Sequence, residues 1–277
     1  MRRRRRIEVQ SPAEIRLMRK AGLAVAAGLA AMTEAARPGV STLELDRIAR
    51  SVLADHGARS NFLGYAGPPP FPGVICSSRN DRIVHGIPSD EDVLAEGDLI
   101  SLDFGAIVDG WHGDAAVTVA VGSVSAAAAQ LSAACRAAMW DGIAAARPGA
   151  HISDISHAVE QSVRSAGDYG IVTGYGGHGI GRQMHMEPHI LNYGAPGHGP
   201  KLSTGMTIAI EPMITLGSPD TVELDDDWTV ATRDGSLAAH WEHTVAVLED
   251  GLWVLTAEDG GRSELVARGV AVSAQAD

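Results

Sequence analysis

The chain has few cysteines, fewer basic than acidic residues and no long apolar run, and each shortage excludes a class of protein. Two cysteines, Cys76 and Cys135, occur among the 277 residues. Two are too few for a disulfide framework or a zinc knuckle, which fits a protein of the reducing cytoplasm. The apolar stretch Ala21–Met32 is too short to span a bilayer, and we interpret it as part of an alanine-rich buried helix.

The chain has 22 basic and 34 acidic residues, which give it a formal net charge of -12. This charge repels the phosphate backbone of nucleic acids, so no DNA partner is expected. The exception is the arginine run Arg2–Arg6. We expect residues 1–10 to form a disordered, solvated basic tip that could touch RNA, for example in a transient contact with the ribosome, or an acidic surface. No membrane partner is expected, and we predict a cytoplasmic monomer.

Three common signatures of catalytic or cofactor sites are either absent or lack the structural context that they need. No G-x-S-x-G motif occurs, which removes the commonest type of serine hydrolase. Gly174, Gly176 and Gly179 fit the dinucleotide pattern G-x-G-x-x-G, but the helix that must follow would soon meet Pro188. The stretch His185–His189 is not H-E-x-x-H, and its proline prevents a helical pair of zinc ligands.

The signals that the sequence does contain predict helices that alternate with strands. Ser11-Pro-Ala-Glu14 has the form of a capping box and predicts a helix that runs to about Ala35. A second helix should begin at Ser41 or Thr42. The prolines of residues 68–72 exclude regular structure there and predict a stiff loop.

Two apolar runs flank Asp109-Gly110, a dipeptide that favours φ > 0 and is typical of a tight hairpin turn. If these residues form the loop, Asp114 pairs with Gly105, and Asp103 lies two residues away on the same face. The two carboxylates would then be roughly 7–8 Å apart at the backbone, within side-chain reach. Acids among apolar neighbours are costly unless they are paired or bind a cation. This stretch alone fits a metal site and a solvent-facing edge hairpin equally well.

The second half of the chain repeats parts of the first. The matching segments, which follow one another in the same order at a nearly constant spacing, are Ala36–Gly39 with Ala146–Gly149, Gly57 with Gly167, Gly64–Gly67 with Gly174–Gly177, and Gly97–Asp103 with Gly205–Glu211. We infer two related α/β halves that meet face to face, with Glu211 at the place of Asp103. The alternative is two helix–turn–strand units that merely share common turn residues.

Four acids and one histidine then form a candidate metal centre. They stand at or near the ends of apolar strands or in a glycine-rich loop: Asp103, Asp114, His178, Glu211 and Glu242. Taken singly, each acid could be an ordinary surface or capping group. As a set without a thiolate they suit Mn, Fe or Co at least as well as Zn. Four carboxylates favour two ions, bridged at about 3.5–4 Å.

The chain resembles the type I methionine aminopeptidases. The matching segments, in the order of that family, are Asn80-Asp-Arg-Ile-Val-His-Gly-Ile-Pro88, Gly97–Asp114, Gly177-His-Gly-Ile-Gly-Arg182, Ile210-Glu-Pro-Met213 and Trp241-Glu-His-Thr244. The resemblance implies a pita-bread fold of the α/β (α+β) class, in which two pseudo-symmetric halves carry antiparallel sheets covered by helices. It implies one catalytic domain over residues 11–256, with pseudo-repeats at about 20–120 and 130–250, and a C-terminal tail at 257–277.

The same resemblance implies a metal-dependent aminopeptidase that removes the initiator methionine. Its substrates would be nascent polypeptides, and peptides with a small second residue. Two divalent ions, of Co, Mn, Fe or Zn, would activate a water that attacks the first peptide bond. Carried over by position, Asp103 would bind one ion, Asp114 and Glu242 would bridge both, and His178 and Glu211 would complete the second.

Further residues acquire roles from the family only. Glu211 would move the proton of the attacking water. His85 would contact the backbone beyond the scissile bond, and His185 would donate a hydrogen bond to the scissile carbonyl. The remaining substrate-binding residues, which form the methionine pocket, would be Tyr65, Cys76, Met184 and Trp228.

Two departures from the family concern this pocket. Met184 stands where many members have phenylalanine, and the loop Pro68–Pro72 is longer than usual. The nearest alternative function is a proline-specific aminopeptidase of the same fold, which usually carries an N-terminal domain for which there is no room before Ser11. A second alternative is a binding protein without activity, but such proteins lose metal ligands, and all five are present here.

Overall fold

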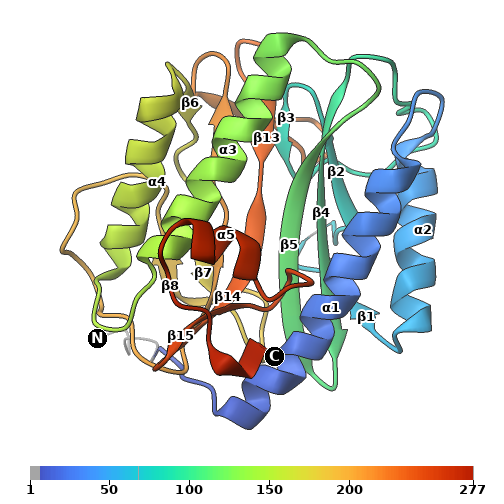
Figure 1. Cartoon of the computed structure of the whole chain (residues 1–277). Coiled ribbons are helices and arrows are strands. Elements are labelled where there is room, and N and C mark those ends of the chain that lie inside the picture. Colours follow the sequence, from blue (N-terminus) through green and yellow to red (C-terminus); the bar gives the residue numbers. More distant parts are fainter. Residues whose placement is uncertain (1–6, 68, 277) are drawn as a thin grey trace.

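The computed structural model describes residues 7–67 and 69–276 (Figure 1). The run Arg2–Arg6 therefore lies outside the described residues. The helices are α1 (Pro12–Ala35), α2 (Thr42–Asp55), α3 (Ala126–Ala145), α4 (Ile152–Ala166) and α5 (Arg262–Ala267). The strands are β1 (Arg59–Ser60), β2 (Ile75–Arg79), β3 (Arg82–Val84), β4 (Leu99–Val108), β5 (Trp111–Ala120), β6 (Gly170–Ile171), β7 (Gly177–Gly179), β8 (Met186–Ile190), β9 (Thr207–Ile210), β10 (Met213–Thr215), β11 (Thr221–Glu223), β12 (Val230–Thr232), β13 (Ala238–His240), β14 (Glu242–Leu248) and β15 (Gly251–Val254).

Local sequence signals set the position of the first helix. The Ser11 hydroxyl accepts a hydrogen bond from the backbone of Glu14, and the Glu14 carboxylate accepts one from the backbone of Ser11. This capping box satisfies amides that have no partner within the helix. Gly28 lets α1 approach the sheet closely, because a Cβ there would lie 2.3 Å from the ring of Phe104. The helix predicted to run to about Ala35 is confirmed.

The strands that carry the candidate residues belong to one antiparallel sheet, with the order β1-β4-β5-β14-β9-β7-β8. Strand β2 pairs with β4, and β15 pairs with β14. Helices α1 to α4 lie on the near side of these strands in Figure 1. Within the β4–β5 hairpin, Gly105 lies opposite Asp114 and Asp103 lies opposite Ala116, which confirms the register predicted from the Asp109-Gly110 turn.

The elements of the two halves follow one another in a similar order. Helices α1 and α2 of the first half correspond in order to α3 and α4 of the second, and strand β4 corresponds to β9. Gly39, which follows α1, and Gly149, which follows α3, have nearly the same left-handed backbone, with φ of 90° and 87°. One apolar cluster is formed mainly by α1, α2 and β4, and a larger one by α3, α4, β9 and β14. Each half therefore has a core of its own.

The two halves are joined where β5 pairs with β14. In the described chain this pairing consists of Glu242 with Ala116 and His243 with Ala115. Beyond each end of this short pairing, a threonine hydroxyl makes the hydrogen bonds that a backbone partner would otherwise make. Thr244 Oγ1 donates to the carbonyl of Asp114 and accepts from its amide, and Thr118 Oγ1 makes the same two bonds with His240. These hydroxyls satisfy backbone groups at the point where the strands separate.

Residues 257–276, where a tail is expected, include α5 and a short 3₁₀-helix, Ala274–Ala276. Leu265 is fully buried, and Leu252 of β15 forms a β-bridge with Val272. The Arg19 guanidinium of α1 donates to backbone carbonyls of residues 254, 255, 257 and 258. This part of the chain is therefore packed against the body of the protein. None of the helices in the described residues has the length and hydropathy needed to cross a membrane.

Candidate active site

The five residues of the predicted metal centre come from both halves of the sheet and line one pocket of about 400 Å³. Asp103 lies on β4 and Asp114 on β5, in the first half. His178 lies on β7, Glu211 directly follows β9, and Glu242 is the first residue of β14, in the second half. The fold thus brings together side chains that are far apart in the sequence.

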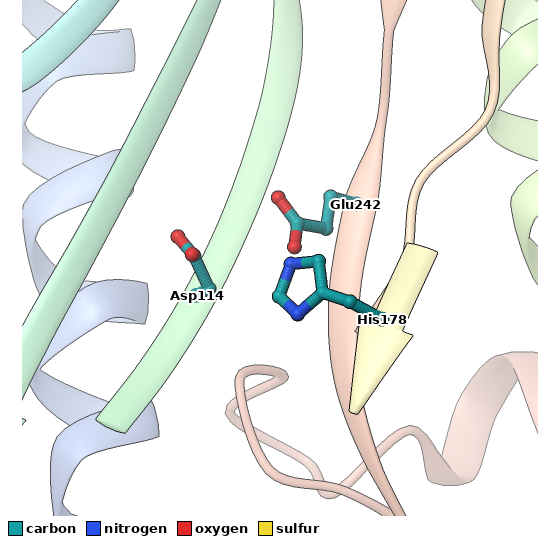
Figure 2. A group of neighbouring side chains, drawn as sticks. All are labelled: Asp114, His178 and Glu242. Atoms are coloured by element: carbon teal, nitrogen blue, oxygen red, sulfur yellow. The ribbon is translucent and has the colours of Figure 1, made fainter. Parts of the chain in front are cut away.

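Figure 2 shows His178 on β7 and Glu242 on β14 side by side and projecting toward β5, which carries Asp114. One ligand atom from each of these residues lies within 4.8 Å of the others, and all three residues are buried. The imidazole Nε2 of His178 is 3.4 Å from Oε1 of Glu211, which adds a fourth member to the group. These separations leave room for cations between the side chains.

Burial raises the pKa of the carboxyl groups at this site. Desolvation raises the pKa of Asp103 to about 7. Desolvation, and then repulsion from the neighbouring carboxylates, raises the pKa of Asp114, Glu211 and Glu242 well above the usual range. In addition, Asp103 Oδ1, Asp114 Oδ1 and Glu242 Oε1 are buried without a hydrogen-bond partner among the described residues. Such oxygens require either protons or cations, and a pair of divalent ions would satisfy them.

His178 is held in the form that binds a metal. Its Nδ1 is 3.0 Å from the carbonyl oxygen of Gly179, which can only accept, so Nδ1 carries the proton. Burial lowers the pKa of His178 to about 3, so the ring is neutral and Nε2 presents a lone pair. This lone pair faces the Glu211 carboxylate, which is also an acceptor. Two acceptors at this distance fit a cation between them, and the donor set therefore fits a metal centre.

The two predicted outer histidines lie in the same pocket. His85 has a left-handed backbone, with φ of 60°, and its ring meets those of Tyr175 and Trp228 edge-on, at centroid distances of 6.0 and 6.2 Å. Burial lowers the pKa of His85 to about 4. The ring of His185 packs edge-on against that of His178, with centroids 4.4 Å apart. Burial also lowers the pKa of His185, so both rings favour the neutral form, in which one nitrogen can donate a hydrogen bond.

The predicted methionine pocket adjoins the acids. Tyr65, Cys76, Met184 and Trp228 all line the cavity. Cys76 on β2 lies directly opposite Asp103 on β4, so the apolar wall and the acid cluster share one place in the sheet. Burial raises the pKa of the Cys76 thiol well above its usual range, which keeps it uncharged. The pocket can therefore hold an apolar side chain beside a polar, acid-lined floor.

Several residues of the site are not found from the sequence. Phe62 and Phe71 pack with Cys76 and Met184, although the loop that holds Phe71 gives no periodic signal. His240 is buried, and its Nε2 is 3.7 Å from Oε2 of Glu211. A ligand atom of His240 also lies within 4.8 Å of ligand atoms of Glu211 and Glu242. His240 stands two residues before Glu242, and this alternation is the signal that could have found it.

The model of metallopeptidase family M24 matches residues 16–249. The chain belongs to this family. It is 55% identical to methionine aminopeptidase 1 of Mycobacterium tuberculosis (strain CDC 1551 / Oshkosh), over 92% of this chain and 97% of that protein. Membership of a metallopeptidase family implies that the chain uses divalent metal.

Solved structures of methionine aminopeptidases and prolidases have the same fold as this chain. A crystal structure of the methionine aminopeptidase from Thermotoga maritima superposes with a TM-score of 0.88 at 38% identity, and the match covers 91% of this chain and 99% of that one. A prolidase from Pyrococcus furiosus has a TM-score of 0.72 at 22% identity, covers 90% of this chain and 65% of its own, and shares the fold alone. The pita-bread fold and the resemblance to methionine aminopeptidases are thereby confirmed.

Proposed function

We propose that this M24 family member is a methionine aminopeptidase that removes the first methionine from nascent proteins and from peptides with a small second residue. The observation that carries the proposal is that the apolar wall of the pocket directly adjoins the acid cluster. Cys76, in the apolar wall, pairs directly with Asp103, in the acid cluster. Side chains paired across an antiparallel sheet are about 5 Å apart at Cβ, so a side chain held on the wall places its own backbone over the acids.

The pocket suits methionine by shape and chemistry. Phe62, Phe71, Met184 and Trp228 present aromatic rings and a thioether to a long, unbranched side chain. Contacts between sulfur and aromatic rings add modestly to the burial of the methylene groups. A free amino terminus that has lost its extra proton presents a nitrogen lone pair that one of the ions would bind, and only the first residue of a chain has such an amine. These features favour removal of one residue from the amino end.

Two divalent ions would be held by five side chains, those of Asp103, Asp114, His178, Glu211 and Glu242. When bound, these ions supply Lewis-acid chemistry and a nucleophilic water at neutral pH. The oxygen and nitrogen ligands, without a thiolate, suit Co, Mn, Fe or Zn. The buried oxygens of Asp103, Asp114 and Glu242 that have no partner in the described structure support this assignment.

The chain's own residues would perform the remaining tasks. Glu211 would accept a proton from the attacking water and pass it to the leaving amine. His185 would donate a hydrogen bond to the scissile carbonyl, and a well-placed donor of this kind is worth about 3 kcal/mol in the transition state. His85, whose ring meets those of Tyr175 and Trp228 edge-on, would contact the backbone beyond the scissile bond. A cytoplasmic, monomeric protein, with ribosome contact by Arg2–Arg6, stays a prediction.

The test is release of methionine from Met-Ala-Ser by protein reconstituted with each candidate metal. Met-Pro and Ala-Pro peptides are the competing substrates, and preference for them would instead favour a prolidase-like activity. Asp103→Ala is expected to abolish metal-dependent release. The matched control is Asp55→Ala, at the exposed end of α2, which should leave activity unchanged. Full activity of Asp103→Ala would refute the metal assignment.

A further inference from the structure

Tyr65 makes a contact that its place in the methionine pocket does not explain. Its hydroxyl oxygen is 2.6 Å from Nδ1 of His185, a residue distant in the sequence. The two rings meet edge to face, with centroids 5.4 Å apart. A methionine pocket needs only the apolar ring at this position, so the hydroxyl requires an explanation of its own. The inference below rests on the proposed function, in which His185 acts on the scissile carbonyl.

The loop around Tyr65 is built to hold this side chain in place. The Tyr65 amide donates to the carbonyl of Phe62 at 2.8 Å, and the Tyr65 carbonyl accepts from the amide of Phe71 at 3.1 Å. Gly64, with φ of 78°, supplies the left-handed turn just before it, which other residues adopt only with strain. The backbone is thus fixed on both sides, so the hydroxyl is delivered to one place.

The ring of His185 is confined as well. Tyr65 contacts it on one side and His178 packs against it on another, at a centroid distance of 4.4 Å. Because Nδ1 is engaged by Tyr65, Nε2 is the nitrogen left for a substrate. Within the described residues Nε2 of His185 makes no hydrogen bond, and the side chain lines the open pocket.

The direction of the hydrogen bond follows from the available partners. The Tyr65 proton has no other acceptor among the described residues, so only donation to Nδ1 uses both this proton and the Nδ1 lone pair. Burial raises the pKa of Tyr65, which keeps its hydroxyl protonated. A ring nitrogen that accepts a hydrogen bond carries no proton, so the His185 ring in this arrangement is neutral. A neutral imidazole that accepts at Nδ1 must carry its proton on Nε2.

We propose that Tyr65 is a positioning residue whose hydroxyl fixes the tautomer of His185, with the proton on Nε2 and directed to the scissile carbonyl of the substrate. In the other tautomer Nε2 would present a lone pair to the carbonyl oxygen, and two acceptors would repel each other. Tyr65 therefore has two tasks. Its ring forms part of the pocket wall, and its hydroxyl prepares the donor that stabilises the transition state.

Nuclear magnetic resonance tests the tautomer without any turnover. Full-length protein labelled with ¹⁵N at histidine is loaded with zinc, which is diamagnetic. The signals of His185 among the 11 histidines are assigned by their loss in His185→Gln. Long-range ¹H–¹⁵N correlations distinguish a protonated from an unprotonated ring nitrogen. The expected wild-type result is an unprotonated Nδ1 and a protonated Nε2, and Tyr65→Phe should reduce the share of this tautomer.

Kinetics on Met-Ala-Ser tests the consequence. Tyr65→Phe keeps the ring and is expected to lower kcat by about 10–100-fold with little change in KM, as is typical when a partner that orients a functional histidine is lost. The matched control is Tyr169→Phe, since Tyr169 does not line this pocket. A protonated Nδ1 in the wild type would overturn the proposal, as would an unchanged tautomer and kcat in Tyr65→Phe. A wild-type protein that releases no methionine would refute the proposed function instead, and the resonance experiment would still decide the tautomer.

Discussion

The clearest quantitative prediction concerns Asp103 in the metal-free protein. Its pKa is about 7 in the folded state and about 3.8 when exposed. Between these values the folded state keeps a proton that the unfolded state has released, so stability falls as pH rises and the loss is complete above pH 7. At 1.36 kcal/mol per pKa unit, this group destabilises the folded chain by about 3 kcal/mol more at pH 8 than at pH 5.

The perturbation is Asp103→Asn, which cannot titrate. In chelated protein the variant should gain about 3 kcal/mol of unfolding free energy relative to the wild type between pH 5 and pH 8. Buried histidines such as His178 have lowered pKa values and act with the opposite sign, but they titrate in both proteins and cancel in the difference. Urea unfolding of both proteins at matched pH values measures this difference in unfolding free energy. Asp55→Asn is the control for the loss of a surface charge.

Bound cations should reverse the order of stability of the wild type and Asp103→Asn. With saturating Mn²⁺ at pH 8 the wild-type carboxylate is ionised and paired, so the wild type should become the more stable protein. A free-energy difference between Asp103→Asn and wild type that does not change with pH in chelated protein would refute the reasoning. So would a wild type that gains no stability from any of the candidate ions.

Two further predictions concern residues that the sequence does not reveal. Phe71→Ala should raise KM for Met-Ala-Ser by about 10-fold or more with a smaller change in kcat, because it removes a buried ring from the methionine pocket; an unchanged KM would place the substrate elsewhere. His240→Leu should weaken metal binding by about 10–100-fold, whereas His240→Gln, which keeps a donor near Glu211, should bind nearly as well as wild type. Isothermal titration of metal-free protein measures this, and equal affinities for all three proteins would exclude a role for His240.

The sequence predicts much of this fold because local chemistry decides it. The capping box at Ser11 and the Asp109-Gly110 turn each act within a few residues, and the structure agrees with both. The candidate metal ligands can be proposed from the sequence because acids at apolar strand ends are costly in isolation. Their convergence depends on how β5 pairs with β14, which joins strands from opposite halves of the chain.

The parts that escape prediction are those made by tertiary contact alone. Phe71 follows a run of prolines without periodicity, and only the folded loop turns its ring onto Trp228, at a centroid distance of 5.2 Å. The bond between Tyr65 and His185 joins two loops that share no pattern. A tyrosine beside glycine predicts a turn, whereas its hydroxyl partner is set by the docking of the two halves.

The short pairing between β5 and β14 affects how firmly the two halves of the protein are held together. Asp103 and Asp114 belong to the first half, and His178, Glu211 and Glu242 belong to the second. Few backbone pairs and the hydroxyls of Thr118 and Thr244 connect the central strands β5 and β14. Ions bound by both sets of residues, as we propose, would therefore cross-link the two halves. Their removal should first loosen the contact between the halves, so that hydrogen exchange rises along this junction before it rises inside either core.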